Sequence, residues 1–257
     1  MNLTTFNRFE KKYIVSESTF TNLIKEFKPY LDKDDHLDFF SYYTIYNIYY
    51  DTAQDEIIKQ SVSKPEFKQK LRLRGYSGNK DNDLVYLELK KKLHGYVNKR
   101  RTLISKEDAD QLIYNKIKPD PQPYHNAQVI NELYYYVLGK QLIPRIAIFY
   151  DRVAYYDKNN HDIRITFDRH ITSRRHDISL NRNNDDIDLI ASDQYLMEIK
   201  TSSSIPLWLT TILTKHKLYS SSFSKYGSEF YDYLITKRKG DEKCLNPYST
   251  YQVRQSL

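Results

Sequence analysis

The stretch K-L-R-L-R at Lys70–Arg74 places Lys70, Arg72 and Arg74 on one face of an extended strand and the two leucines on the other. A second stretch, L-V-Y-L-E-L-K-K-K at Leu84–Lys92, keeps the same two-residue period. This period is typical of a β-strand with one buried face. The opposite face is unusual, because it carries charges where half-buried strands ordinarily carry mixed polar residues.

The same charged alternation recurs on about six strand-like segments of the chain. The charged faces comprise Arg8, Glu10 and Lys12; Lys70, Arg72 and Arg74; Glu88, Lys90 and Lys92; Lys99 and Arg101; Arg164 and Asp168; and Glu198 and Lys200. On one strand such a face is most simply a solvated surface, since mixed charges keep a protein soluble. Repeated on many strands, with more Lys and Arg than carboxylates, it favours faces turned inward around an anionic ligand. Unpaired buried cations cost several kcal/mol each, so such a lumen must be wide and hydrated.

The remaining pattern predicts an α+β fold. Alternating segments predict eight strands, near 6–15, 42–51, 69–75, 84–91, 96–104, 145–156, 162–171 and 194–201. Helical spacing predicts helices after Ser16, after Ser105, between Asn126 and Gly139, from Pro206 to Tyr219 and over 228–236. We therefore expect an antiparallel eight-stranded β-barrel, closed or nearly closed into a tunnel, with the helices packed outside. Residues 1–240 are expected to form a single domain and 241–257 a C-terminal tail, with loops over 31–38 and 173–193.

Composition excludes several classes of protein. The 257 residues include 40 Lys and Arg against 33 Asp and Glu, a net charge of +7, and 40% are hydrophobic, which excludes a wholly disordered chain. We see neither a transmembrane run nor a signal peptide, so we expect a cytoplasmic protein. The single Cys excludes an intrachain disulfide and argues against a Cys-based zinc site. The phosphate-binding motifs G-x-x-x-x-G-K-[ST] and G-x-G-x-x-G are both missing, which argues against P-loop and Rossmann enzymes.

The charges themselves indicate a ligand. Phosphate oxygens accept charge-assisted hydrogen bonds from Lys and Arg. Carboxylates cannot bind phosphate directly, but they can hold a divalent cation that bridges to it. The pattern therefore predicts a tunnel for a chain of phosphates together with a metal ion.

Some charged residues have a simpler interpretation. Lys91 and Arg100 alternate with the predicted lumen residues, so they should point away from the lumen. Asp168 lies on the lumen face, where a pair with Arg164 and a role in the site are equally consistent with the pattern.

Nine short motifs, in this order, resemble the triphosphate tunnel metalloenzyme superfamily, also called CYTH-like, and most closely its VTC branch, the polyphosphate polymerase domain. They cover roughly residues 7–230. They are R-F-E-K-K-Y-I at 8–14, Y-Y-D-T at 49–52, K-L-R-L-R at 70–74, L-E-L-K at 87–90, N-K-R-R at 98–101, Y-D-R-V-A-Y at 150–155, R-I-T-F-D at 164–168, L-M-E-I-K at 196–200 and F-S-K-Y at 223–226. Each motif is weak by itself, whereas nine in the family's order are specific.

This resemblance implies an ATP-dependent polyphosphate polymerase, which transfers the γ-phosphate of ATP to a growing polyphosphate chain with a divalent metal, Mn²⁺ or else Mg²⁺. The residues that it implies in catalysis are Arg72, Arg74, Arg152 and Lys200. Those implied in binding the phosphates are Arg8, Lys12, Lys70, Lys90, Lys92, Lys99, Arg101, Arg164, Ser224 and Lys225. Glu198 is implied as the metal ligand, with Glu10 and Glu88 as further carboxylates that orient the metal or the cations.

Two positions depart from the family's pattern. Arg8 stands where the hydrolytic tunnel enzymes carry the first Glu of E-x-E-x-K, which argues against a triphosphatase. Lys92 stands where eukaryotic VTC domains commonly carry a His. The alternatives are a triphosphate or polyphosphate hydrolase in the same tunnel, a non-catalytic polyphosphate sensor, and a nucleic-acid binder that stacks bases on some of the 25 Tyr. We expect ATP and polyphosphate as partners, with no nucleic acid and no membrane segment.

Overall fold

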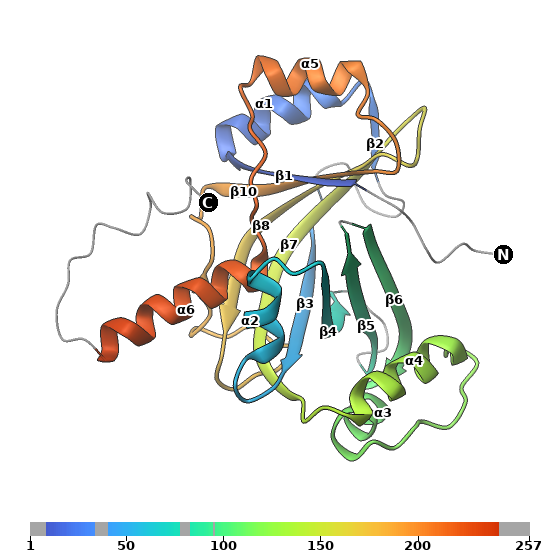
Figure 1. Cartoon of the computed structure of the whole chain (residues 1–257). Helices are drawn as coiled ribbons and strands as arrows, with labels where there is room; N and C mark the ends of the chain where they lie inside the picture. The colour runs from blue at the N-terminus through green and yellow to red at the C-terminus, as the bar shows by residue number, and fades with distance from the viewer. Residues whose placement is uncertain (1–8, 34–40, 78–82, 95, 242–257) are drawn as a thin grey trace.

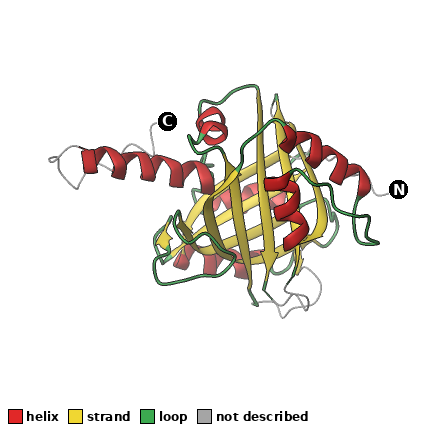
Figure 2. Cartoon of the chain, turned by 90° about the horizontal axis from the view of Figure 1, so that it is seen from below, coloured by secondary structure: helices red, strands yellow, loops and turns green. Residues whose placement is uncertain are grey.

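The computed structural model describes residues 9–33, 41–77, 83–94 and 96–241. Its centre is an antiparallel sheet with the strand order β1-β10-β8-β7-β3-β4-β5-β6. The strands are β1 Phe9–Ser16, β3 Tyr43–Asp51, β4 Phe67–Tyr76, β5 Leu84–Leu93, β6 Tyr96–Ser105, β7 Ile143–Asp157, β8 Arg164–Arg174 and β10 Gln194–Thr201. Two short strands, β2 (Leu31–Lys33) and β9 (Ile187–Asp188), pair with β7 and β8. Seen from below, the strands of the sheet curve round (Figure 2).

Each of the eight predicted strands is present, and several have ends that differ from the prediction by up to three residues; residues 6–8 of the first lie outside the described residues. β2 and β9 lie in segments that the sequence predicted to be loops. They have three and two residues, too few to show a two-residue period. They form because β7 and β8 extend beyond the ladders that they make with their main partners.

The predicted closed barrel is not found. β1 and β6 are the two ends of the strand order, and no ladder joins them in the described residues, so the sheet is open there. Part of the reason lies at Lys12, because the free edge of β1 is already in use at this residue. The backbone N–H of Ser221, in the connection before α6, donates to the carbonyl of Lys12 at 2.7 Å.

The helices begin largely where the sequence placed their caps. They are α1 Glu17–Phe27, α2 Glu56–Val62, α3 Lys106–Asp110, α4 Ala127–Leu138, α5 Leu207–Lys215 and α6 Lys225–Asp241, with a π-helical turn over Gln111–Asn115. The side chains of Ser16, Ser105 and Asn126 each accept a hydrogen bond from the backbone N–H three residues on, at 3.0–3.2 Å. α5 stops short of Tyr219, because Lys217 takes a left-handed conformation with φ of 51°. No helix in the described ranges is long and apolar enough to cross a bilayer.

α2 is the helix that the sequence did not predict. It has seven residues and follows Asp55, which has φ of 59° and makes no side-chain cap bond. Its first N–H groups are instead bonded by Asp51, whose carboxylate accepts from the backbone of Ile57 and Ile58 at 2.8 and 2.9 Å. Asp51 lies at the end of β3, several residues before the helix begins, whereas a capping residue is expected immediately before the first helical residue.

Two groups of helices, α1 with α5 and α3 with α4, cover the apolar outer face of the sheet (Figure 1). α1 and α5 lie on β1, β10 and β8, where Phe27 packs near Phe167. α3 and α4 lie on β4, β5 and β6, where Leu133 joins a buried cluster with Leu87.

α2 and α6 pack on the inner face instead, where Ile58 and Phe230 form a third cluster with Ile45, Tyr49 and Tyr150, which also border the inner cavity. The prediction that the helices pack outside is therefore wrong for these two, because β3 and β7 carry apolar residues on their inner face as well. On the other strands the apolar face is buried outward, so the charged face turns inward.

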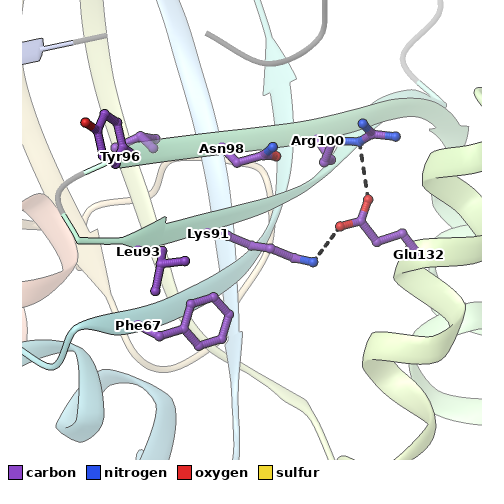
Figure 3. Close-up of a pocket in the computed structure, with 8 residues that line it drawn as sticks. Phe67, Lys91, Leu93, Tyr96, Asn98, Arg100 and Glu132 are labelled. Carbon is purple, nitrogen blue, oxygen red and sulfur yellow. Dashed lines mark ion pairs between the residues drawn. The ribbon is translucent and has the colours of Figure 1, made fainter. Parts of the chain in front are cut away.

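A small pocket of about 300 Å³ lies on the outer face where β4, β5 and β6 end. Figure 3 shows Lys91 and Arg100 pointing towards Glu132 of α4. The ion pairs are 2.6 Å from Lys91 and 3.2 Å from Arg100, and they fasten α4 to the sheet. The prediction that Lys91 and Arg100 point away from the lumen is confirmed, although Arg100 also borders the larger inner cavity at the sheet edge.

Candidate functional site

The concave inner face of the sheet borders a cavity of about 700 Å³. Among the described residues, the cations that line it are Lys12, Lys70, Arg72, Arg74, Lys90, Lys99, Arg100, Arg101, Arg152, Arg164, Lys200 and Lys225. The carboxylates that line it there are Glu10 and Glu198, and Ser224 adds a hydroxyl. Residues from strands far apart in the chain thus surround one space with a large excess of positive charge.

Two of the predicted site residues that the structure describes do not line this cavity. Lys92 is paired in register with Lys68 near the end of β5, away from the lining residues. Glu88 is fully buried beneath the arginines. Arg8 lies outside the described residues.

One wall of the cavity is formed by β4, β5 and β6, and we call it the β4–β6 wall. It carries Lys70, Arg72, Arg74, Glu88, Lys90, Lys99 and Arg101. Arg72 Nε donates to Glu88 Oε2 at 2.6 Å, and the same carboxylate lies 3.7–4.0 Å from Lys99, Arg74 and Arg101. Although burial opposes ionisation, Arg72 and Arg74 hold the pKa of Glu88 well below its ordinary value. A single buried carboxylate is therefore shared by four surrounding cations and neutralises only part of their charge.

The lysines of this wall lie next to one another across the strands. The register pairs Lys70 with Lys90, and Lys90 with Lys99. Burial, together with the ammonium groups of Lys90 and Lys68, lowers the pKa of Lys70 to about 7. Burial also lowers the pKa of Lys99 to about 7, against the attraction of Glu88. A bound anion would raise both pKa values, so we expect Lys70 and Lys99 to be more fully protonated when an anion binds beside them.

The opposite wall is formed by β1, β10 and β8 with neighbouring residues of β7 and α6, and we call it the β1–β10–β8 wall. It carries Glu10, Lys12, Arg152, Arg164, Asp168, Glu198, Lys200 and Lys225. At its centre Glu198 lies 2.8 Å from Lys200, 3.5 Å from Lys12 and Arg152, and 3.6 Å from Lys225. Burial opposes ionisation of Glu198, but Lys200 and Lys225 keep its pKa well below the ordinary value.

Asp168 belongs to this wall and pairs with residues other than the expected one. Arg152 donates two hydrogen bonds to its carboxylate at 2.6 and 2.7 Å, and Lys225 donates a third at 2.6 Å. The pair with Arg164, one of the two possibilities that the sequence left open for Asp168, is not the one formed, because four residues along one strand span about 13 Å. Arg152, in contrast, lies directly opposite Asp168 in the β7–β8 register.

Uncharged residues complete the site, and sequence reasoning missed most of them. Arg72 donates to the hydroxyl of Tyr49, and Arg74 to that of Tyr150, each at 3.1 Å. The ring of Tyr150 also lies under Lys225, whose Nζ is 4.4 Å from the ring centroid. The two-residue period could have identified them, since Tyr150 stands two residues before the predicted Arg152.

A metal ion would be held on the β1–β10–β8 wall. Lys12 bridges Glu10 and Glu198, at 3.0 and 3.5 Å. Burial disfavours the charged form of Glu10, but Lys12 and Lys90 lower its pKa to about 2. Glu10 and Glu198 are therefore both anionic at neutral pH. Two anionic oxygen donors suit Mg²⁺ or Mn²⁺, which take further oxygens from phosphates and water. Within the described residues, no group of three or more His, Cys, Asp or Glu could hold a metal, and Glu88 stays with the cations of the other wall.

Comparisons with known proteins place the chain in a family. None of the curated proteins compared with it gives a match. Among solved structures, a Bacillus halodurans protein proposed to be an adenylate cyclase is 14% identical, with a TM-score of 0.44 over 99% of this chain and 100% of that one. The PH1819 protein of Pyrococcus horikoshii is also 14% identical, with a TM-score of 0.44 over 91% of this chain and 99% of that one. The model of the VTC domain matches residues 7–231, and the chain therefore belongs to the VTC domain family.

Proposed function

We propose that this chain is a polyphosphate polymerase, which transfers the γ-phosphate of ATP to the end of a polyphosphate chain inside the cavity. The observation that carries the proposal is the cavity itself, where Lys and Arg side chains from both walls of a VTC domain surround one space. A linear polyphosphate carries charge at every phosphate, so it can neutralise many of these cations at once.

The β4–β6 wall would bind the phosphate chain. Arg72 and Arg74 lie two residues apart on one face, and each guanidinium is held in place by hydrogen bonds to neighbouring side chains. Lys70, Lys90 and Lys99 continue the row along the same wall. This arrangement can grip successive phosphates, because a fixed guanidinium loses little further freedom on binding.

The β1–β10–β8 wall would support the chemical step. A terminal oxygen of the polyphosphate attacks the γ-phosphorus in line, the bond from that phosphorus to the bridging oxygen of ADP breaks, and ADP leaves. The attacking oxygen is already anionic, so no general base is required. Arg152 and Lys200 lie beside Glu198 and would neutralise charge on the attacking and leaving oxygens. Ser224, next to Lys225 at the start of α6, would donate its hydroxyl to a phosphate oxygen.

Glu198 and Glu10 would hold a divalent metal, Mn²⁺ or Mg²⁺, which would supply positive charge to neutralise the phosphate oxygens. Lys12 and Lys200 would then turn from these carboxylates towards the phosphates, which carry more negative charge. The carboxylates thus keep the cations ordered before substrate enters.

An elongation assay tests the proposal. The protein is incubated with ATP, Mn²⁺ and a short polyphosphate primer, and the products are sized on a gel. We expect chains longer than the primer, and loss of elongation in Glu198→Ala. The matched control is Glu66→Ala, because the Glu66 side chain is 81% exposed and does not line the cavity.

Other outcomes would replace the proposal. Free phosphate without longer chains would indicate a hydrolase, in which water takes the place of the polyphosphate end. Binding of tripolyphosphate without turnover in the presence of ATP, metal and primer would indicate a sensor.

A further inference from the structure

Asn47 is a buried polar side chain on the inner face of β3, and neither its strand pattern nor the motifs assign it a role. It is fully buried and lies opposite Arg74 on one side and Ile148 on the other. Its Nδ2 donates to the carbonyl of Ile148 at 3.0 Å, and its Oδ1 accepts from Arg74 Nε at 2.9 Å. A buried amide is tolerated when it is bonded on both ends, as here.

Asn47 does for Arg74 what Glu88 does for Arg72. Each acceptor bonds Nε of its arginine, at 2.9 Å and 2.6 Å. Each arginine then donates a terminal N–H to a tyrosine hydroxyl at 3.1 Å, Arg72 to Tyr49 and Arg74 to Tyr150. Both guanidinium groups are therefore fixed at Nε and at one further nitrogen, which aims the rest of each group into the cavity.

The two acceptors differ in charge. Glu88 is a carboxylate that stays ionised, so it offsets part of the charge of Arg72. Arg152, the corresponding arginine of the other wall, has its Nε on the carboxylate of Asp168 at 2.6 Å. Arg74 has its Nε on a neutral amide, and the nearest oxygen of Glu88 lies 3.9 Å away and already bonds Arg72.

We propose that Asn47 is a positioning residue, which orients Arg74 as tightly as a carboxylate would while leaving the positive charge of Arg74 available to a phosphate chain. The proposal rests on the function proposed above and deepens it, since it makes Arg74 the anchor for the polyanion on the β4–β6 wall. A carboxylate at position 47 would also accept from Arg74, but it would lack the N–H that Asn47 donates to Ile148 and would cancel the charge that the ligand needs.

Two substitutions separate orientation from charge. Asn47→Asp keeps an acceptor for Arg74 and adds a negative charge, whereas Asn47→Ala removes the acceptor and adds none. Both variants lose the N–H that Asn47 donates to Ile148, so this loss does not distinguish them. Binding of tripolyphosphate is measured by titration calorimetry over a series of salt concentrations, with thermal unfolding as the check on folding. We expect both variants to bind tripolyphosphate about tenfold more weakly, since each substitution removes or alters the hydrogen bond between residue 47 and the charged Arg74.

The salt dependence then distinguishes them. We expect each ionic contact to contribute up to about one unit to the slope of log K against log salt concentration, by analogy with the phosphates of nucleic acids. Asn47→Asp should therefore lose about one unit of slope, and Asn47→Ala should keep the wild-type slope. A purely structural role would leave the two variants with the same slope, and that result would overturn the proposal.

If Asn47→Asp does not fold, a third variant tests whether the charge of the acceptor sets the charge that the arginine offers to the ligand. Glu88→Gln replaces the carboxylate that bonds Arg72 by a neutral amide, the type of acceptor that Arg74 has. The slope of log K against log salt concentration should therefore become steeper by about one unit. An unchanged slope in Glu88→Gln would contradict the inference. Wild-type protein that does not bind tripolyphosphate would remove the proposed function as well, whereas wild-type binding with equal slopes in both Asn47 variants would remove this inference alone.

Discussion

The two walls of the cavity hold their cations in opposite ways. On the β1–β10–β8 wall the carboxylates of Glu10, Asp168 and Glu198 lie within 2.6–3.6 Å of the surrounding cations. On the β4–β6 wall Glu88 is the one carboxylate of the set, against Lys70, Arg72, Arg74, Lys90, Lys99 and Arg101. The first wall has three carboxylates against five cations, so much of its charge is balanced before a ligand binds, whereas the second has one carboxylate against six cations and leaves most of its charge to the ligand.

Most of the pKa shifts follow this difference, although burial lowers the pKa of Lys200 on the first wall despite the neighbouring Glu198. Against burial, Glu198 and Glu10 raise the pKa of Lys12, and Asp168 and Glu198 raise that of Lys225. The pKa of Lys70, in contrast, is lowered to about 7 by burial and by the neighbouring lysines. Substitutions on the two walls should therefore act in opposite directions on the stability of the free protein and should differ in their effect on anion binding.

The largest expected effect is on binding. Arg72→Ala/Arg74→Ala should weaken binding of tripolyphosphate by about two to four orders of magnitude, since two charge-assisted contacts are worth about 1.5–3 kcal/mol each. Titration calorimetry measures the change, and the rise in Tm on adding tripolyphosphate should shrink with it. Lys91→Ala is the control, because Lys91 pairs with Glu132 on the outer face. A double variant that binds like the wild type would refute the role of this wall.

On the other wall the largest effect should be on folding. Glu198→Gln leaves Lys12, Arg152, Lys200 and Lys225 without their shared carboxylate. Removal of one partner from a buried ion pair lowers the free energy of unfolding by about 3–5 kcal/mol. Urea denaturation measures it, and tripolyphosphate should restore part of the loss. Wild-type stability in this variant would show that the wall does not depend on its carboxylates.

A matched lysine pair sharpens the comparison. Lys70→Met should stabilise the free protein by up to about 1 kcal/mol, because like charges directly opposite each other on neighbouring strands repel. Lys12→Met should destabilise it, because Glu10 and Glu198 lose their shared cation. Thermal unfolding without ligand measures both, and changes of the same sign would contradict the distinction between the walls. Both variants should bind tripolyphosphate more weakly.

The smallest effect concerns pH. Lys70 and Lys99 have pKa values of about 7 in the folded protein and about 10.4 when unfolded, so their protonation disfavours folding. The destabilisation of the folded protein by these two lysines is fully present below pH 7 and disappears as the pH rises towards about 10.4. Over that range their contribution therefore makes the free protein more stable as the pH rises. Binding of tripolyphosphate at pH 8 should take up as many as about two protons, measured by calorimetry in two buffers of different ionisation enthalpy. Binding without proton uptake would contradict the shifts.

The two-residue period predicted which faces form the site. It placed Lys70, Arg72, Arg74 and Lys90 on one face, and all four line the cavity. This succeeds because strand geometry alone sends alternate side chains to opposite sides. Lys92 follows the same period but does not line the cavity, because it lies near the end of its strand beside Lys68.

Contacts between strands were beyond the reach of the sequence pattern. Asp168 was considered as a partner of Arg164 and instead pairs with Arg152, because partners are set by register across strands. Asn47 and Tyr150 are ordinary strand residues until the β3–β4 and β3–β7 ladders bring them to Arg74. The openness of the sheet likewise depends on Ser221, which occupies the edge of β1 from a distant part of the chain.

The sequence by itself determined the strands, their charged faces and the excess of cations, because each of these follows from local alternation and composition. Only the tertiary structure decided which carboxylate neutralises which cation, and so which wall is left to the ligand. The physical reason is that an ion pair depends on a distance of a few ångströms between side chains from different strands. The register and curvature of the whole sheet set that distance.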